Sequence, residues 1–155
     1  MKIISTFLFA TLFLIACGDN EAAQKAQYKV QDDLMATGME IHDEVMPKMG
    51  ELNGYKRNIN NILSSNAQQL TEQQIEQGRE VVVQLDRADE AMKSWMFNIP
   101  DVKGMRTTEA DHATIVKALE QSNAQATEMN ALIQRALTNG AATLAALQQA
   151  IIVEE

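Results

Sequence analysis

The stretch LMATGMEIHDEVMPKMGELNGYKRNINNI, from Leu34 to Ile62, decides the fold. Apolar and small residues return in it every three or four positions, at Leu34, Gly38, Ile41, Val45, Met49, Leu52, Tyr55, Ile59 and Ile62. The mean step is about 3.5 residues, the coiled-coil value, so the stretch predicts a long helix with one face against partner helices. Because Pro47 removes a backbone hydrogen bond within this face, we expect a kink near Val45, after which the helix resumes.

Two later segments show the same spacing. Residues 71–98 predict a second helix whose inner face carries Val81, Leu85, Ala88, Met92, Trp95 and Ile99. Thr71, with Gln74 three residues later, predicts a capping box at its start, and Pro100 ends it. After a connection from Pro100 to Arg106, we expect Thr107 to open a third helix whose inner face carries His112, Ile115, Leu119, Ser122, Ala126, Met129, Ile133 and Ala136.

These segments predict an all-α fold, an antiparallel bundle of three long helices, because short loops make sequential helices antiparallel. A straight third helix over residues 107–151 would be roughly 67 Å long, against roughly 40 Å for the second, and would overshoot the bundle. The heptad spacing continues to Ala150 and favours that straight helix, but Thr138-Asn139-Gly140 is a helix stop signal. We therefore expect a break at Asn139-Gly140 and a short fourth C-terminal helix folded onto the bundle.

The beginning of the chain carries a different signal. An apolar run from Ile3 to Ala16 follows the basic Lys2 and is too short to span a bilayer stably, which is typical of a cleavable signal segment. The run ends in Leu14-Ile15-Ala16-Cys17, which resembles the lipobox of bacterial lipoproteins, and Cys17 is the only cysteine in the chain. The resemblance implies cleavage before Cys17 and lipidation of its sulfur. The alternative is an ordinary signal peptide with a chance cysteine.

The chain then divides into a signal peptide (1–16), the lipidated Cys17 with a polar tether (17–27) and a helical bundle domain (28–155). Removing residues 1–16 leaves 139 residues with 12 basic and 21 acidic side chains, a net charge of −9. Such an acidic body is repelled by nucleic acid and by anionic lipid, so we expect the membrane to be contacted only through the lipid on Cys17. Gly18 stands directly after the cysteine, where many proteobacterial lipoproteins retained at the inner membrane carry Asp, so the resemblance implies the outer membrane. Acidic Asp19 and Glu21 resemble the short signal with which some Bacteroidota lipoproteins reach the cell surface, so we expect the periplasmic face of the outer membrane or the cell surface.

The sequence shows no pattern of catalytic chemistry: no glycine-rich phosphate loop, no zinc-ligand spacing and no nucleophile elbow. Paired acids such as Asp32-Asp33 are typical of a solvated helix face. We therefore predict a non-enzymatic protein without a cofactor, whose partner is an unknown protein or small ligand of the envelope. A small-ligand or enzyme site inside the bundle is an alternative without support in the sequence.

One group of residues could bind a metal. Met35, Met39, His42, Met46 and Met49 recur at steps of four and three and share one edge of the first helix. Thioether and imidazole ligands suit Cu(I) or Ag(I), and the face of Trp95 could cover such an ion, so Met39, His42, Met46 and Met49 are candidate metal ligands. The interpretation that we favour is simpler: methionine fills a core that is poor in aromatic residues.

The run Ile41 to Leu52, with Ala91-Met92-Lys93-Ser94-Trp95-Met96 later in the chain, resembles small Bacteroidota lipoproteins labelled "viral A-type inclusion protein". That label implies a helical protein and no activity, so no site residues follow from it. We interpret Pro47 and Trp95 as one packing layer, in which the tryptophan fills the space that the bend opens. The sequence thus predicts a lipid-anchored envelope lipoprotein acting as a binding or structural module, with soft-metal binding as the alternative.

Overall fold

The computed structural model describes residues 16–153, with side chains from Asn20 to Ile152. Within this range all regular structure is helical, so the predicted all-α class is confirmed. Residues 1–15 of the predicted signal segment, including Leu14 and Ile15 of the predicted lipobox, lie outside the described residues, and Ala16 is the first residue of α1. The elements are α1 (Ala16–Val45), η1 (Met46–Lys48), α2 (Met49–Ser65), η2 (Ala67–Gln69), α3 (Glu72–Phe97), α4 (Val102–Thr107) and α5 (His112–Val153).

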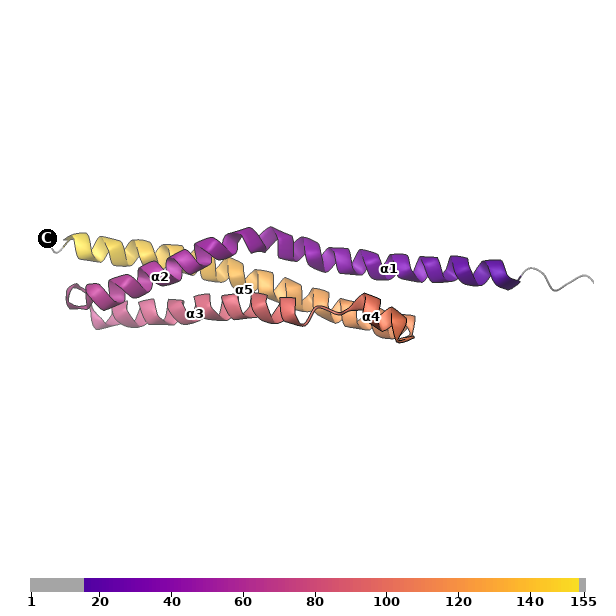
Figure 1. Ribbon diagram of the computed structural model, residues 1–155. Coiled ribbons are helices and arrows are strands. Elements are labelled where there is room, and N and C mark those ends of the chain that lie inside the picture. Colours follow the sequence, from indigo (N-terminus) through magenta and orange to yellow (C-terminus); the bar gives the residue numbers. More distant parts are fainter. Residues whose placement is uncertain (1–15, 154–155) are drawn as a thin grey trace, which may run out of the picture.

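The helices form a long antiparallel bundle (Figure 1). Helices α1 and α2 together make one bent rod, α3 runs back beside α2, and α5 returns beside α3, α2 and the later part of α1. α5 packs against α1, α2 and α3, so it is the element that every other long helix contacts. The predicted bundle of three long helices is confirmed, with α1 and α2 forming the first.

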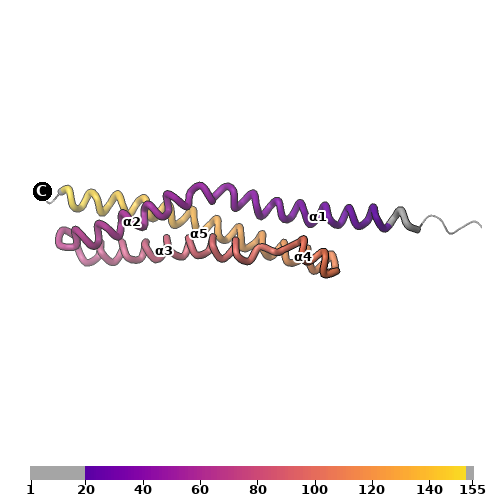
Figure 2. The backbone as a smooth tube through the Cα atoms, viewed as in Figure 1, coloured from indigo at the N-terminus to yellow at the C-terminus, as the bar shows by residue number. Residues whose placement is uncertain are grey.

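The first rod bends at Pro47, as the sequence predicts. α1 ends at Val45, and three residues of tighter 3₁₀ helix that include Pro47 separate it from α2. The smooth backbone tube shows this change of direction (Figure 2). Val45 and Met49, on either side, are buried in the core, whereas Pro47 is exposed. The apolar face therefore stays continuous across the bend.

The second rod begins as predicted. The Thr71 hydroxyl accepts a hydrogen bond from the Gln74 backbone N–H at 3.3 Å, and the Gln74 side chain accepts the Thr71 N–H at 2.8 Å. This reciprocal pair satisfies two backbone donors that have no partner in the first turn of a helix. α3 ends at Phe97, three residues before Pro100.

The segment after Pro100 differs from the prediction, because the expected connection is itself a short helix. The Asp101 carboxylate accepts a hydrogen bond from the Gly104 N–H at 2.9 Å and caps α4 at its N-terminus. A carboxylate in this position satisfies a free donor and complements the helix dipole. α4 continues past the end of α3 beside the first turns of α5 (Figure 1).

The third long helix starts at His112, and the prediction that it opens at Thr107 is wrong. The Asp111 carboxylate accepts the Thr114 backbone N–H at 2.7 Å, and this bond holds the pKa of Asp111 below its ordinary value. Aspartate is a better N-cap than threonine, which explains the later start. Glu109, with a φ of 57°, makes the turn between α4 and α5.

The predicted break at Asn139-Gly140 and the short fourth C-terminal helix are wrong, because α5 runs unbroken from His112 to Val153. Gly140 does not adopt the positive φ of a helix C-cap. Instead, carbons of Tyr55 on α2 lie 3.1–3.2 Å from the place where a Gly140 Cβ would be. The glycine therefore serves the close approach of two helices. α5 does not overshoot, because α4 extends the neighbouring layer at one end and α2 accompanies α5 at the other.

The segment expected to be a tether is also helical. Residues 20–27 belong to α1, and all their side chains are exposed. Glu21 and Lys25 form an ion pair at 2.7 Å one turn apart, in a segment rich in alanine and glutamine. Residues with high helix propensity and a favourable i,i+4 pair explain why this polar stretch continues the helix. α1 projects past the end of the bundle formed by α4 and α5 (Figure 1).

The buried residues follow the predicted faces and form two clusters. The larger cluster lies between α1, α2, α3 and α5 and includes Val45, Leu52, Leu85, Trp95 and Ile133. The smaller cluster joins Val102 of α4 to Ile115 and Leu119 of α5, with Leu34 and Met35 of α1 packed against it.

The bend gives a first test. Pro47→Ala restores a backbone donor and should straighten the first rod, raising helicity seen in far-ultraviolet circular dichroism while shifting the fluorescence of Trp95, the only tryptophan. Gly50→Ala is the control, because a Cβ at Gly50 meets nothing within 4 Å. It should raise the free energy of unfolding by about 1 kcal/mol and leave the fluorescence unchanged. An unchanged Trp95 spectrum in Pro47→Ala would show that the bend and the tryptophan are independent.

Candidate functional site

One candidate site lies where α1, α3 and α5 meet at Trp95. The Trp95 side chain is buried, and its ring stacks on the His42 imidazole, with ring centroids 5.7 Å apart and planes 25° from parallel. The indole N–H donates to the Ser122 carbonyl oxygen on α5 at 2.9 Å. A buried tryptophan needs such an acceptor for its polar atom. Trp95 therefore bridges all three helices by packing and one hydrogen bond.

Gly38 makes room for this contact. A Cβ on Gly38 would lie 3.4 Å from Cζ2 of Trp95 and 2.6 Å from Oδ1 of Asn123. The Asn123 amide in turn donates to the Leu34 carbonyl oxygen on α1 at 2.9 Å. The glycine in the predicted stripe is thus a point where α1 comes close to Trp95 of α3 and Asn123 of α5.

The protonation of His42 follows from its neighbour. Its Nδ1 lies 2.9 Å from Oδ1 of Asp43, and a carboxylate only accepts, so Nδ1 carries the proton. In the neutral ring Nε2 then holds a free lone pair. That atom is buried and has no hydrogen-bond partner among the described residues. The histidine side chain as a whole is 13% exposed.

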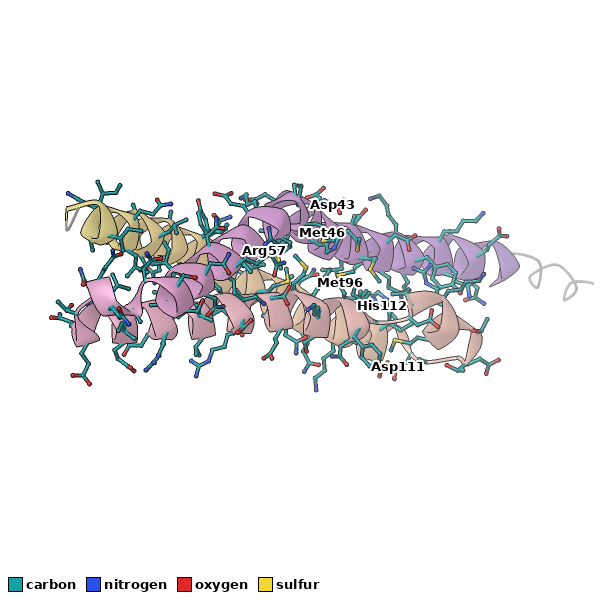
Figure 3. All side chains as sticks on the ribbon, turned by 60° about the vertical axis from the view of Figure 1, so that its left-hand side comes forward. Asp43, Met46, Arg57, Met96, Asp111 and His112 are labelled. Atoms are coloured by element: carbon teal, nitrogen blue, oxygen red, sulfur yellow. The ribbon has the colours of Figure 1, made fainter. Side chains whose placement is uncertain are left out.

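The structure separates the predicted metal candidates by exposure. Met49 is buried in the larger cluster, Met39 is partly buried against it, and Met46 is 44% exposed at the bend. Figure 3 labels Met46 beside Asp43 at the bend and Met96 on α3. Within the described residues no three His, Cys, Asp or Glu side chains form a metal-binding group. Any ion held here would therefore depend on the thioethers of methionine.

The predicted layer of Pro47 and Trp95 stays a prediction. Trp95 contacts α1 at Gly38 and His42, which lie before the bend. Pro47 lies on the exposed side of the chain. Cys17, the predicted lipidation site, falls in the first turn of α1, and its side chain is outside those described.

A second polar group, which we call the Arg106 clamp, joins α1, α4 and α5. It consists of Tyr28, Gln31, Asp32, Arg106 and His112. The Arg106 guanidinium donates to the Gln31 side-chain oxygen at 2.6 Å, to the Tyr28 carbonyl oxygen at 3.0 Å and to the Asp32 carboxylate at 2.8 Å. It also lies 4.3 Å from the centre of the Tyr28 ring.

Gln31 is the buried member of the clamp, with 1% of its surface exposed. Since its oxygen accepts from Arg106, its nitrogen donates to Nδ1 of His112 at 3.1 Å, which places the His112 proton on Nε2. Every polar atom of the Gln31 amide group thus faces a partner of matching type. Figure 3 shows His112 and Asp111 at this end of α5. The arrangement holds the helices in register and exposes no reactive group.

Sequence reasoning missed this clamp, although a signal was present. Gln31 lies three residues before Leu34, so it continues the apolar stripe by one step as a polar residue. A polar residue in such a position is typical of a buried hydrogen bond that fixes register. Arg106 carried no such signal, because its segment was interpreted as a connection.

The hollows described on the surface do not coincide with either polar group. Two are lined by α3 residues, among them Glu76 and Glu80, and a third by α1 residues from Asn20 to Gln27. Each is lined by residues of one helix only, so these hollows lie on the outside of the bundle.

Comparison of the chain with protein-family models, curated proteins and solved structures gives no match. None of the helices described between residues 16 and 153 is long and apolar enough to cross a membrane.

The Arg106 clamp can be tested by a charge-conserving change. Arg106→Lys keeps the charge and removes the planar fork, so a single ammonium group cannot replace the bonds to the Gln31, Tyr28 and Asp32 oxygens together. We expect a loss of about 1–3 kcal/mol in the free energy of unfolding, measured with urea, and faster amide hydrogen exchange in α4 and around Tyr28. Arg79→Lys, at a 68% exposed side chain, is the control and should change stability by less than about 0.5 kcal/mol. Equal stability of the two variants would contradict the role of the clamp.

Proposed function

We propose that this protein is a lipid-anchored lipoprotein of the bacterial cell envelope and that its helical bundle is a non-enzymatic binding or structural module. The observation that carries the proposal is the sole cysteine, Cys17, directly after an apolar run in the sequence Leu14-Ile15-Ala16-Cys17. Acyl chains on that cysteine would supply the membrane affinity, at about 0.8 kcal/mol for each buried CH₂. The net charge of −8 argues against a second, electrostatic anchor on anionic lipid.

The exposed first turns of α1 support an anchored arrangement. Residues 20–27 contact no core cluster, yet they continue the helix that enters the bundle. The twelve residues from Ala16 to Gln27 span roughly 18 Å at 1.5 Å per residue. This exposed helix would act as a spacer between a lipid on Cys17 and the packed part of the domain.

The interior of the bundle supports a non-enzymatic role. The buried side chain of Gln31 is hydrogen-bonded to Arg106 and His112 within the Arg106 clamp. Ser122, which is also buried, accepts the Trp95 indole N–H through its backbone carbonyl. The surface hollows are lined by Glu, Gln and Arg side chains of single helices. Their surroundings offer no nucleophile with an adjacent base. We place the protein at the outer membrane, on its periplasmic face or at the cell surface, because Gly18, Asp19 and Glu21 follow the cysteine.

The anchor is tested by Cys17→Ser in the full chain. We expect the wild-type protein in the membrane fraction, labelled by a palmitate analogue, and the variant unlabelled and either soluble or uncleaved. Ala16→Gly, which keeps a small residue before the cysteine, is the matched control and should behave as wild type. Membrane fractionation of Cys17→Ser like that of the wild type, with cleavage at the same position, would refute lipid anchoring.

A further inference from the structure

His42 holds a buried acceptor that the packing of the bundle does not use. Its Nδ1 donates to Asp43, its ring stacks on Trp95, and the lone pair of Nε2 has no partner among the described residues. Buried polar atoms are nearly always paired, so an unpaired one needs a physical explanation. By contrast, the buried side chains of Gln31 on α1 and Trp95 on α3 form hydrogen bonds within the protein with their polar atoms.

We propose that Nε2 of His42 is a ligand for a soft monovalent cation, Cu(I) or Ag(I), which the thioethers of Met39 and Met46 also bind and the Trp95 indole flanks. The proposal goes beyond lipid anchoring and does not depend on it. Neutral imidazole and thioethers are the ligands that such ions prefer, whereas Ca²⁺ and Mg²⁺ prefer oxygen.

Helix geometry places these side chains together. Met39 precedes His42 by three residues within α1, and Met46 follows it by four as the first residue of η1, which continues directly from α1. Spacings of three and four bring helical side chains onto one face, and long side chains lean toward the N-terminus, so we expect Met46 over the turn of His42 and His42 over that of Met39. His42 is therefore the central residue of the three.

The hydrogen bond from Nδ1 to Asp43 fits the same role. Histidines that bind metals almost always donate their other ring nitrogen to a carboxylate or carbonyl, which fixes the tautomer and raises the basicity of the ligand nitrogen. Asp43 Oδ1, at 2.9 Å, occupies that position here. Met46 is 44% exposed, so an ion in solvent can reach this side chain directly.

The fluorescence of Trp95 can report the binding of an ion to His42. It is the only tryptophan, and its ring is stacked on the proposed ligand, so an ion bound to Nε2 should quench its fluorescence. The experiment uses the full chain in detergent with Cys17→Ser in every variant, because the thiol of any unlipidated Cys17 would itself bind Cu(I). Cu(I) is titrated without oxygen against a competing chelator, and Ag(I) is titrated separately. We expect saturable quenching at one ion per chain, with a rise in melting temperature.

Two variants assign the ligands, and each has a matched control. His42→Phe keeps an aromatic ring against Trp95 and removes the nitrogen, and Met46→Leu keeps the apolar volume and removes the sulfur. We expect His42→Phe to weaken binding about 100-fold or more and Met46→Leu about tenfold or more, while metal-free melting stays at or near that of the parent. His112→Phe and Met105→Leu are the controls, since they alter the other histidine and a methionine of the smaller cluster. His112→Phe removes the acceptor of the buried Gln31 amide and should lower the metal-free melting temperature, but both controls should bind the ion like the parent.

The titration results distinguish a metal site at His42 from the absence of one. Quenching that is lost in His42→Phe and retained in His112→Phe supports the site, and Met46→Leu provides the same decision if His42→Phe fails to fold. Absence of saturable quenching and of any melting shift with both ions overturns the proposal. So does binding of equal strength in His42→Phe, or binding that His112→Phe weakens as strongly.

Discussion

The structure depends on covering one buried stripe that runs along α5 from Ile115 to Leu147. A single helix of 42 residues cannot keep such a stripe in water, and no other helix described between residues 16 and 153 is long enough to cover it. The cover is therefore made in pieces. α1 lies over the first half and α2 over the second, while α3 and α4 together form the other side. The bend at Pro47 and the break at Pro100 are the places where one of these pieces ends and the next begins.

This division explains what the sequence could and could not predict. The heptad faces were predictable, because Leu85, Ile133 and their neighbours recur at a spacing that only a buried helix face produces. The capping box at Thr71 was predictable from local chemistry. The continuity of α5 was not, because Gly140 has the same identity whether it ends a helix or receives the ring of Tyr55, and only the partner helix decides between them. α4 was missed for a similar reason, since six residues are too few to show a period.

The polar contacts in the interior show most clearly what could not be predicted from the sequence. Gln31 was visible as a polar residue in line with an apolar face, but its partner Arg106 is 75 residues away in a segment without a pattern. The candidate metal ligands were predicted from their spacing alone. What the sequence could not supply was the state of the His42 nitrogen, which depends on the stacking of Trp95 and on the carboxylate of Asp43. This unpaired imidazole nitrogen supports the proposed metal site, because methionines that only fill the core do not explain it.

The exposed N-terminal turns of α1 restrict how the domain can move. A flexible linker lets a tethered domain sample a sphere of positions and all orientations, with an effective concentration set by the length of the linker. Here residues 20–27 are continuous with the helix that carries His42, and the turns that follow them are held to α4 and α5 by the Arg106 clamp. Because the helix is continuous, the orientation of the beginning of α1 is expected to be coupled to the orientation of the whole bundle. A chain held at its N-terminal end would present the same sides of the rod to its surroundings and hold the α2–α3 loop and the C-terminal end of α5 at the opposite end of the rod.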